Sequence, residues 1–130
     1  MKKLLLILVL AFMSSSVMAE WIRVNYDSGN GSTTYVNFFT IEKSDRTVKM
    51  WSLVDYKKAQ ERAFLPLYTS INSQNEFNCM EGQMRELYAA YHAKNMGEGK
   101  VTFSDNTPDS WNVVPPDSIG KELWKYACGK

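Results

Sequence analysis

Histidine and cysteine are scarce in this chain, whose 130 residues include one histidine, His92, and two cysteines, Cys79 and Cys128. Three such side chains are too few for a structural zinc site, which normally has four ligands. A catalytic cysteine–histidine pair would need a reduced thiol close to the imidazole. We therefore interpret His92 as an ordinary surface or partly buried residue, and we assign no catalytic, metal-binding or cofactor-binding residue.

The chain also lacks an excess of charge of either sign, because it has 15 basic and 14 acidic side chains and a formal net charge of +1. Nucleic-acid binding needs a concentrated basic face, so we expect no nucleic-acid partner. The carboxylates form no pair at an informative spacing, although a glycosidase-type pair brought together by folding stays open as an alternative. The carboxylates considered are Asp27, Glu42, Asp45, Asp55, Glu61, Glu76, Glu81 and Glu86.

No apolar run reaches the roughly 20 residues that a membrane-spanning helix needs. The apolar segment Leu4–Met13 follows Lys2 and Lys3 and precedes a run of small residues that ends at Ala19. This order of a positive end, a short apolar segment and a small-residue cleavage site is typical of a secretory signal peptide of bacterial style. A retained membrane anchor is the alternative interpretation.

Cleavage after Ala19 would leave residues 20–130 as a single small domain in the periplasm or outside the cell. Glu20 and Trp21 follow the expected cleavage site. Because neither is a cysteine, we expect no lipid anchor on the mature chain.

Export changes what the two cysteines indicate. In an oxidising compartment two cysteines are enough for one bridge, and we predict a Cys79–Cys128 disulfide, with free thiols or a metal site as alternatives. Such a bridge would close a loop that contributes roughly 4 kcal/mol in the chain-entropy model. It would also tie down the end of the chain, which otherwise tends to fray.

Two strands are predicted at the ends of a turn-rich segment. Residues 21–26 alternate between polar and apolar types, and residues 33–39 are of β-favouring types. The segment 27–32 between them is rich in turn residues, which predicts a hairpin. Residues 48–56 carry apolar side chains on both faces, so we place this strand at the centre of the sheet.

The next part of the chain is less regular. We expect residues 57–67, charged and then apolar, to form a long connection, because Pro66 discourages a regular strand. Residues 67–78 and 100–105 predict further strands. A loop through residues 106–116 leads to a final helix, capped by Asp117 or Ser118 and ended by Gly129.

Residues 84–93 leave helix and strand open. Apolar residues recur at helical spacing, and the composition favours a helix. The same residues also alternate as a strand would. The helical set is Met84, Leu87, Tyr88 and Tyr91; the strand faces would be Met84, Glu86, Tyr88, Ala90 and His92 against Arg85, Leu87, Ala89 and Tyr91.

Aromatic residues are abundant, with four tryptophans and seven tyrosines. One interpretation is a small core filled by large side chains. The other is an exposed aromatic surface that serves a homodimer, a protein partner or a ligand, since Trp and Tyr dominate binding hot spots. The four tryptophans are Trp21, Trp51, Trp111 and Trp124.

Several blocks of the chain together resemble the surface-adhesin protein E family of small exported proteobacterial proteins. They are "WIRV", "TYVN", "VKMWSLVDYKKAQ", "EFNC" and "MGEGKVTFSDNTPDSWNVVPPDSIGKELWKYACGK". The resemblance covers essentially all of residues 20–130. It implies an α+β fold, an antiparallel sheet of about six strands with a C-terminal helix packed on it, and it implies that residues 84–93 form a strand.

The resemblance also implies a function. The family includes an outer-membrane lipoprotein that attaches to host matrix proteins such as vitronectin and laminin. We therefore expect an exported, non-enzymatic, protein-binding molecule whose partners are host extracellular-matrix proteins or envelope proteins. The alternatives are a periplasmic structural or envelope-stress protein, and a small hydrolase or ligand carrier. The residues that carry the resemblance are typical of core and disulfide positions, so no binding residue is transferred.

Overall fold

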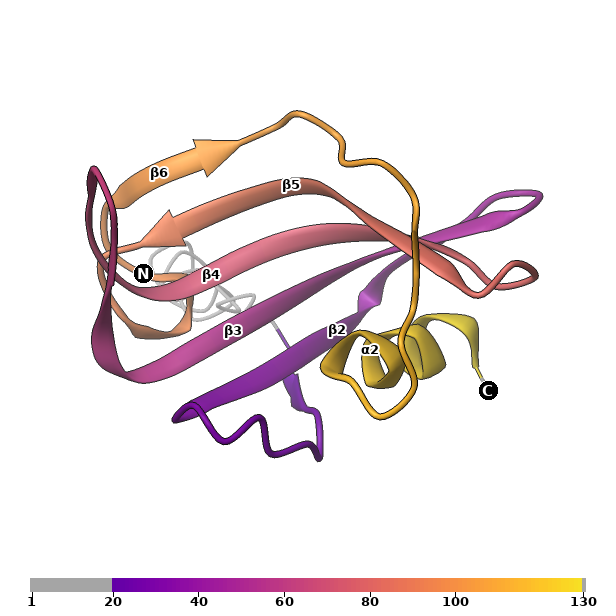
Figure 1. Cartoon of the computed structure of the whole chain (residues 1–130), viewed down its shortest axis with the longest axis horizontal. Coiled ribbons are helices and arrows are strands. Elements are labelled where there is room, and N and C mark those ends of the chain that lie inside the picture. The colour runs from indigo at the N-terminus through magenta and orange to yellow at the C-terminus, as the bar shows by residue number, and fades with distance from the viewer. Residues whose placement is uncertain (1–19, 130) are drawn as a thin grey trace, which may run out of the picture.

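The structure, a computed structural model, describes residues 20–129 (Figure 1). The signal peptide predicted at residues 1–19 lies outside the described residues. Most of the described chain forms strands, with one α-helix near its end. The elements are β1 (Ile22–Arg23), β2 (Ser32–Lys43), β3 (Thr47–Arg62), β4 (Leu65–Asn78), β5 (Gln83–His92), the 3-10 helix η2 (Asn95–Gly97), β6 (Val101–Asp105), β7 (Asn112–Val113) and α2 (Ile119–Cys128).

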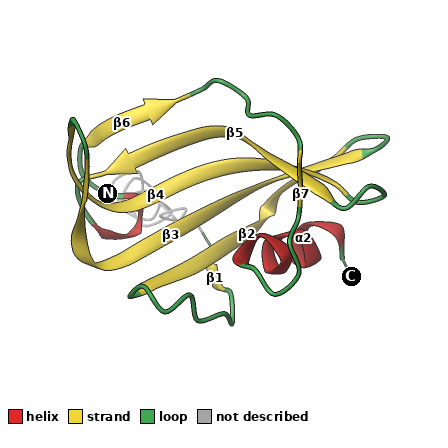
Figure 2. Cartoon of the chain, in the orientation of Figure 1, coloured by secondary structure: helices red, strands yellow, loops and turns green. Residues whose placement is uncertain are grey.

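The strands form one antiparallel sheet in the order β1-β2-β3-β4-β5-β6, with β7 added beside β5 as the seventh strand. Each strand of the main path therefore pairs with its neighbour in sequence, as Figure 2 shows. This arrangement confirms the predicted α+β fold, the hairpin formed by β1 and β2, and the central position of β3 between β2 and β4.

Helix α2 packs on one side of the sheet, which we call the helix face; the opposite side is the open face. Alternation along β3 places Met50 in the core beneath the helix and Trp51 on the open face. The helix contributes Leu123, Trp124 and Ala127 to the core. The buried core residues are Val24, Val36, Val48, Met50, Phe77, Val114, Leu123, Trp124 and Ala127.

The helix begins and ends at the predicted residues. Ser118 is the N-cap, and its hydroxyl accepts a hydrogen bond from the backbone N–H of Lys121 at 3.1 Å. Gly129 ends the helix with φ 70°, a left-handed conformation that glycine adopts without steric cost.

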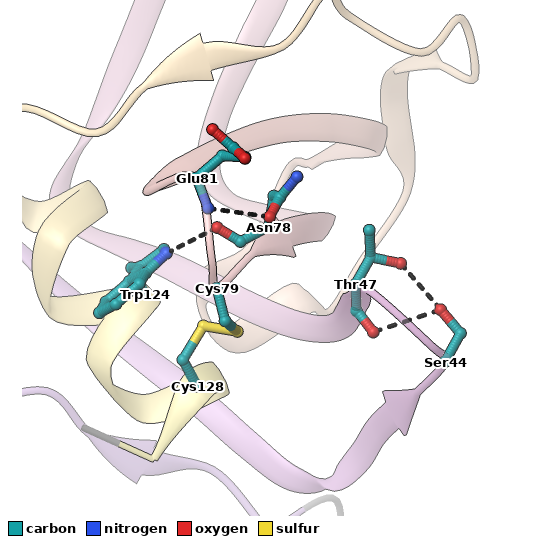
Figure 3. Close-up of a disulfide and its surroundings, with 7 residues drawn as sticks. All are labelled: Ser44, Thr47, Asn78, Cys79, Glu81, Trp124 and Cys128. Atoms are coloured by element: carbon teal, nitrogen blue, oxygen red, sulfur yellow. Dashed lines mark hydrogen bonds between the residues drawn. A yellow bond between two sulfur atoms is a disulfide. The ribbon is translucent and has the colours of Figure 1, made fainter.

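The predicted Cys79–Cys128 disulfide is present and joins the end of α2 to the turn after β4 (Figure 3). The two Cα atoms lie 5.7 Å apart, and 49 positions separate the cysteines in sequence. One turn earlier, the indole N–H of Trp124 donates to the backbone carbonyl of Asn78 at 3.3 Å. The bridge and this hydrogen bond hold the helix against the end of β4.

The expectation of a long connection at residues 57–67 is wrong. Strand β3 continues to Arg62 and β4 begins at Leu65, so the segment forms the tip of a tight hairpin. Pro66 is tolerated because it lies between the paired residues Arg62↔Leu65 and Gln60↔Tyr68, where the register shifts and the regular ladder is interrupted. The loop expected before α2 also differs in detail, since it contains the short strand β7.

Residues 84–93 are a strand, as the family resemblance implies, and a bulge explains their helical spacing. Gln74 pairs with Tyr88, but the next residue of β4, Asn75, pairs with Glu86, which leaves Leu87 as the extra residue. Because of this bulge, Met84 and Tyr91 both lie on the helix face of the sheet. Residues seven positions apart would also share one side of an α-helix, which explains why the sequence pattern resembles a helix. The strand faces predicted for these residues are wrong for the same reason.

Candidate binding surface on the open face of the sheet

The open face carries an aromatic pair at its centre. Trp51 of β3 and Tyr88 of β5 flank Gln74 of β4, with which both are paired across the strands. Their ring centroids lie 5.6 Å apart, and the rings meet edge to face at 64°. Both side chains are half-buried, so part of each remains accessible to a partner.

An ion pair lies beside the aromatic pair. The guanidinium of Arg85 donates from Nη2 and Nε to Oε1 of Glu76 at 2.7 and 2.8 Å. The hydroxyl of Thr47 donates to the second oxygen, Oε2, at 3.1 Å. The ring of Trp111 lies against the same guanidinium, 4.6 Å from its centre to the Arg85 Cζ atom. Arg85 is therefore held in one position before any partner arrives.

On the other side of Trp51 the surface is hollowed. A cavity of about 250 Å³ is lined by Trp21, Asn37, Thr40, Trp51 and Asn72. The irregular register of β2 after Asn37 shapes it, because the Thr40 hydroxyl turns back to donate to the Asn37 carbonyl and accepts from the Trp51 N–H. Asn72 Oδ1 is buried without a hydrogen-bond partner among residues 20–129.

We call the residues Trp21, Trp51, Tyr88, Arg85 and Trp111 the aromatic row. Its members come from the segment before β1, from β3, from β5 and from the loop before β7. Of the four tryptophans considered from the sequence, three lie in this row and Trp124 lies in the core. Arg85 and Tyr88 are not recognisable from the sequence as members of this row, because the bulge at Leu87 hides the fact that they share a face.

A second aromatic cluster lies on the helix face, at the end of the sheet away from α2. Tyr68 contacts Tyr56 and Tyr91 with ring centroids 6.0 and 4.8 Å apart, and Tyr91 contacts Phe103 at 5.5 Å. Arg62 donates from Nη1 to the Tyr91 hydroxyl at 2.6 Å. Burial raises the pKa of Tyr56 and Tyr91 above the ordinary value, so both phenols are neutral at physiological pH.

Glu86 projects from β5 on the same face. Burial is the main cause that raises its pKa above the usual range, and the neighbouring carboxylates Asp109 and Asp105 raise it further. A hydrogen bond with Ser73 acts in the opposite direction. No group of three or more potential metal ligands is found among residues 20–129.

The residues weighed for catalysis lie apart from the aromatic row or are already bonded. Both cysteines are in the disulfide, so neither offers a thiolate to a substrate or a metal. His92 ends β5 and pairs with Ser70 and Val101; its Nδ1 is buried without a partner in the described chain. Of the carboxylates considered, Glu76 is the one in direct contact with the aromatic row, through Arg85.

In the region spanning residues 20–129, no helix has the length and apolar character needed to cross a bilayer. The short α2 and the single-turn η2 are the helices of this region.

Comparison with known proteins agrees with this architecture. A crystal form of Haemophilus influenzae protein E matches with a TM-score of 0.67 at 15% identity, covering 88% of this chain and 91% of that chain. Protein E from non-typeable Haemophilus influenzae matches with a TM-score of 0.62 at 14% identity, covering 88% and 79%. These likenesses show the fold.

No curated protein sequence matches the chain. A family profile described as "Surface-adhesin protein E" matches residues 21–129, nearly the whole of the part that the structure describes. The chain belongs to the surface-adhesin protein E family.

Proposed function

We propose that this chain is an exported, non-enzymatic, adhesin-like protein that binds another protein through the aromatic row on the open face of its sheet. The observation that carries the proposal is the position of Trp51, Tyr88 and Arg85 on a face that α2 does not cover. Tryptophan, tyrosine and arginine are the residue types enriched in binding hot spots.

The row also has the rigidity that favours binding. Arg85 is fixed by Glu76 and by the ring of Trp111, and Trp51 is braced by Tyr88. Side chains that are already ordered lose less conformational entropy when a partner docks. The half-buried rings would add apolar contact area without the cost of rearranging the sheet.

The partner class follows from the family. The family's description names surface adhesion, which supports a host extracellular-matrix protein or a protein of the bacterial envelope as the partner. The disulfide supports an oxidising location, the periplasm or the outside of the cell. A role confined to the periplasm, without adhesion, is the competing function.

The first experiment measures binding of the mature chain, residues 20–130, to immobilised matrix proteins. Trp51→Ala and Tyr88→Ala should each weaken binding by about tenfold or more, as hot-spot residues do. Met80→Ala is the matched control, since Met80 is 85% exposed but lies in the turn beside the disulfide. Equal affinity for all variants would exclude the open face as the binding surface.

Location separates the two candidate functions. Intact cells are treated with a protease and fractionated, and each fraction and the culture medium are probed for the protein. Surface or medium protein that the protease removes would support adhesion. Protein that stays protected in the periplasm would exclude host contact and direct the search to envelope partners, including a second copy of the chain.

A further inference from the structure

The tip of the β3–β4 hairpin exposes a continuous apolar segment. Residues 63–67 read Ala-Phe-Leu-Pro-Leu, and four of the five are exposed. Phe64 is 106% exposed and Leu67 is 53% exposed. Other exposed apolar side chains of the described chain lie in shorter apolar runs, since Phe39 has the exposed Phe38 beside it and Met80 lies between Cys79 and Glu81.

Phe64 does not stabilise the fold from this position. Its φ is 65°, a left-handed conformation that glycine or asparagine adopts more readily than a bulky side chain. Its full exposure means that the ring makes no compensating contact within the described chain. In the free protein, Phe64 therefore has both an unfavourable backbone conformation and an apolar ring exposed to water. This combination indicates that the ring contacts another molecule.

Basic side chains precede the apolar tip in the β3 arm of the same hairpin. Lys57, Lys58 and Arg62 are exposed, against one acidic residue, Glu61, between them. Lys57 lies beside the β1–β2 turn, where its N–H donates to the Gly31 carbonyl at 3.1 Å. The hairpin therefore ends in apolar side chains and carries a net positive charge behind them.

Arg62 also fixes the direction of the hairpin. Its guanidinium donates to the Tyr91 hydroxyl and lies 5.6 Å from the centre of that ring. Because Tyr91 belongs to β5, this contact ties the hairpin to the body of the sheet. The tip is thus presented on a braced support and not on a free loop.

We infer that the hairpin tip docks on a lipid bilayer that carries anionic phospholipids, with Phe64 and Leu67 entering the interface and Lys57 and Lys58 facing the headgroups. The charge order matches such a surface, since each nearby Lys or Arg adds attraction to anionic lipid. Two side chains on one hairpin offer far less area than the roughly 800 Å² per partner of a stable protein interface. They are sufficient for shallow, reversible membrane contact supported by charge.

The test is flotation of the mature chain with vesicles of phosphatidylethanolamine and phosphatidylglycerol, compared with vesicles of phosphatidylcholine alone. The wild-type chain should float with the anionic vesicles, and added salt should reduce the bound fraction. Phe64→Gly should lower the bound fraction by about tenfold, because the buried aromatic area is lost. Its melting temperature should stay equal or rise, since glycine accepts φ 65°.

A second variant tests the charge. Lys57→Glu combined with Lys58→Glu should abolish the preference for anionic vesicles while leaving the fold intact, because both side chains are exposed. Phe39→Asp is the matched control: Phe39 is 80% exposed on β2, away from the hairpin, and its replacement should leave flotation unchanged.

Three results would overturn the inference: no flotation of the wild-type chain, flotation of Phe64→Gly equal to wild type, or an equal loss in Phe39→Asp. If the tip binds a soluble protein but no vesicle, the wild-type chain does not float, and the inference is overturned. Trp51→Ala should float normally, so failure of the membrane test and failure of the protein-binding test can be told apart.

Discussion

Glu76 lies on the open face with 10% of its side chain exposed, and Arg85 pairs with its carboxylate. Removing the partner of a nearly buried carboxylate leaves an uncompensated charge, which costs more than the pair itself contributes. Arg85→Met should therefore lower the free energy of unfolding by about 2 kcal/mol, measured by urea denaturation.

The control for this prediction is a surface pair in helix α2. Lys125 Nζ lies 3.3 Å from Glu122 Oε1, and both side chains are well solvated. Lys125→Met should change the free energy of unfolding by less than about 0.5 kcal/mol. An Arg85→Met variant as stable as Lys125→Met would mean that Glu76 obtains enough hydration without its partner.

Glu86 predicts a pH dependence of stability. Its pKa is raised in the folded chain, mainly by burial, so the folded state holds the proton more tightly than the unfolded chain. The stabilisation is therefore complete below the ordinary glutamate pKa and is lost as the pH rises through the raised value. At neutral pH the ionised carboxylate works against folding.

Glu86→Gln should accordingly raise the melting temperature at pH 7. The difference from wild type should shrink as the pH falls through the raised pKa of Glu86 and should reach its smallest value below the ordinary glutamate pKa of 4.5. Glutamine can still accept the hydrogen bond from Ser73. Thermal melts at several pH values measure this directly. A constant difference at every pH would assign the effect to packing instead of ionisation.

At the scale of elements, helix α2 is held by one covalent bond and one packed face. Breaking a native bridge of this loop length costs about 4 kcal/mol, so Cys128→Ser should lower the free energy of unfolding by about that amount. Hydrogen exchange should rise first in α2, because the helix is the element that the bond ties to the sheet.

Cys79→Ser should have the same effect, and the double variant should lose little more, since each single change already removes the whole bond. If the melting temperature of Cys128→Ser equals that of wild type, the core contacts of Leu123, Trp124 and Ala127 hold the helix without the bond.

At the scale of the whole molecule, α2 covers one face of the sheet and η2 covers only the Leu53–Asp55 end of the other, which leaves the rest of the open face for contact. The aromatic row and the hairpin tip lie on different parts of this molecule, so protein binding and membrane contact need not compete. We propose that the mature chain begins at Glu20 and carries no lipid. Mass spectrometry of protein from the envelope fraction should give an unmodified N-terminus at Glu20; a mass that includes residues 1–19 would contradict cleavage.

The sequence by itself determined most of the strands, the disulfide and the limits of α2, whereas the complete α+β fold was implied by the family resemblance. Each of these depends on local signals: alternation in β3, the capping hydroxyl of Ser118 and a pair of cysteines. The strand at residues 84–93 came from family resemblance, because its own periodicity equally favoured a helix.

Only the tertiary structure decided which side chains share a face. The bulge at Leu87 shifts the alternation by one residue, so Arg85 and Tyr88 lie together on the open face. No local sequence pattern predicts this bulge. The hairpin at residues 57–67 was missed because charged residues and Pro66 argue against a strand, whereas pairing with the neighbouring strand supplied the missing stability. Local sequence signals specify the individual strands and the helix. The register between strands is set by long-range packing, and this register decides which side chains come together on the open face.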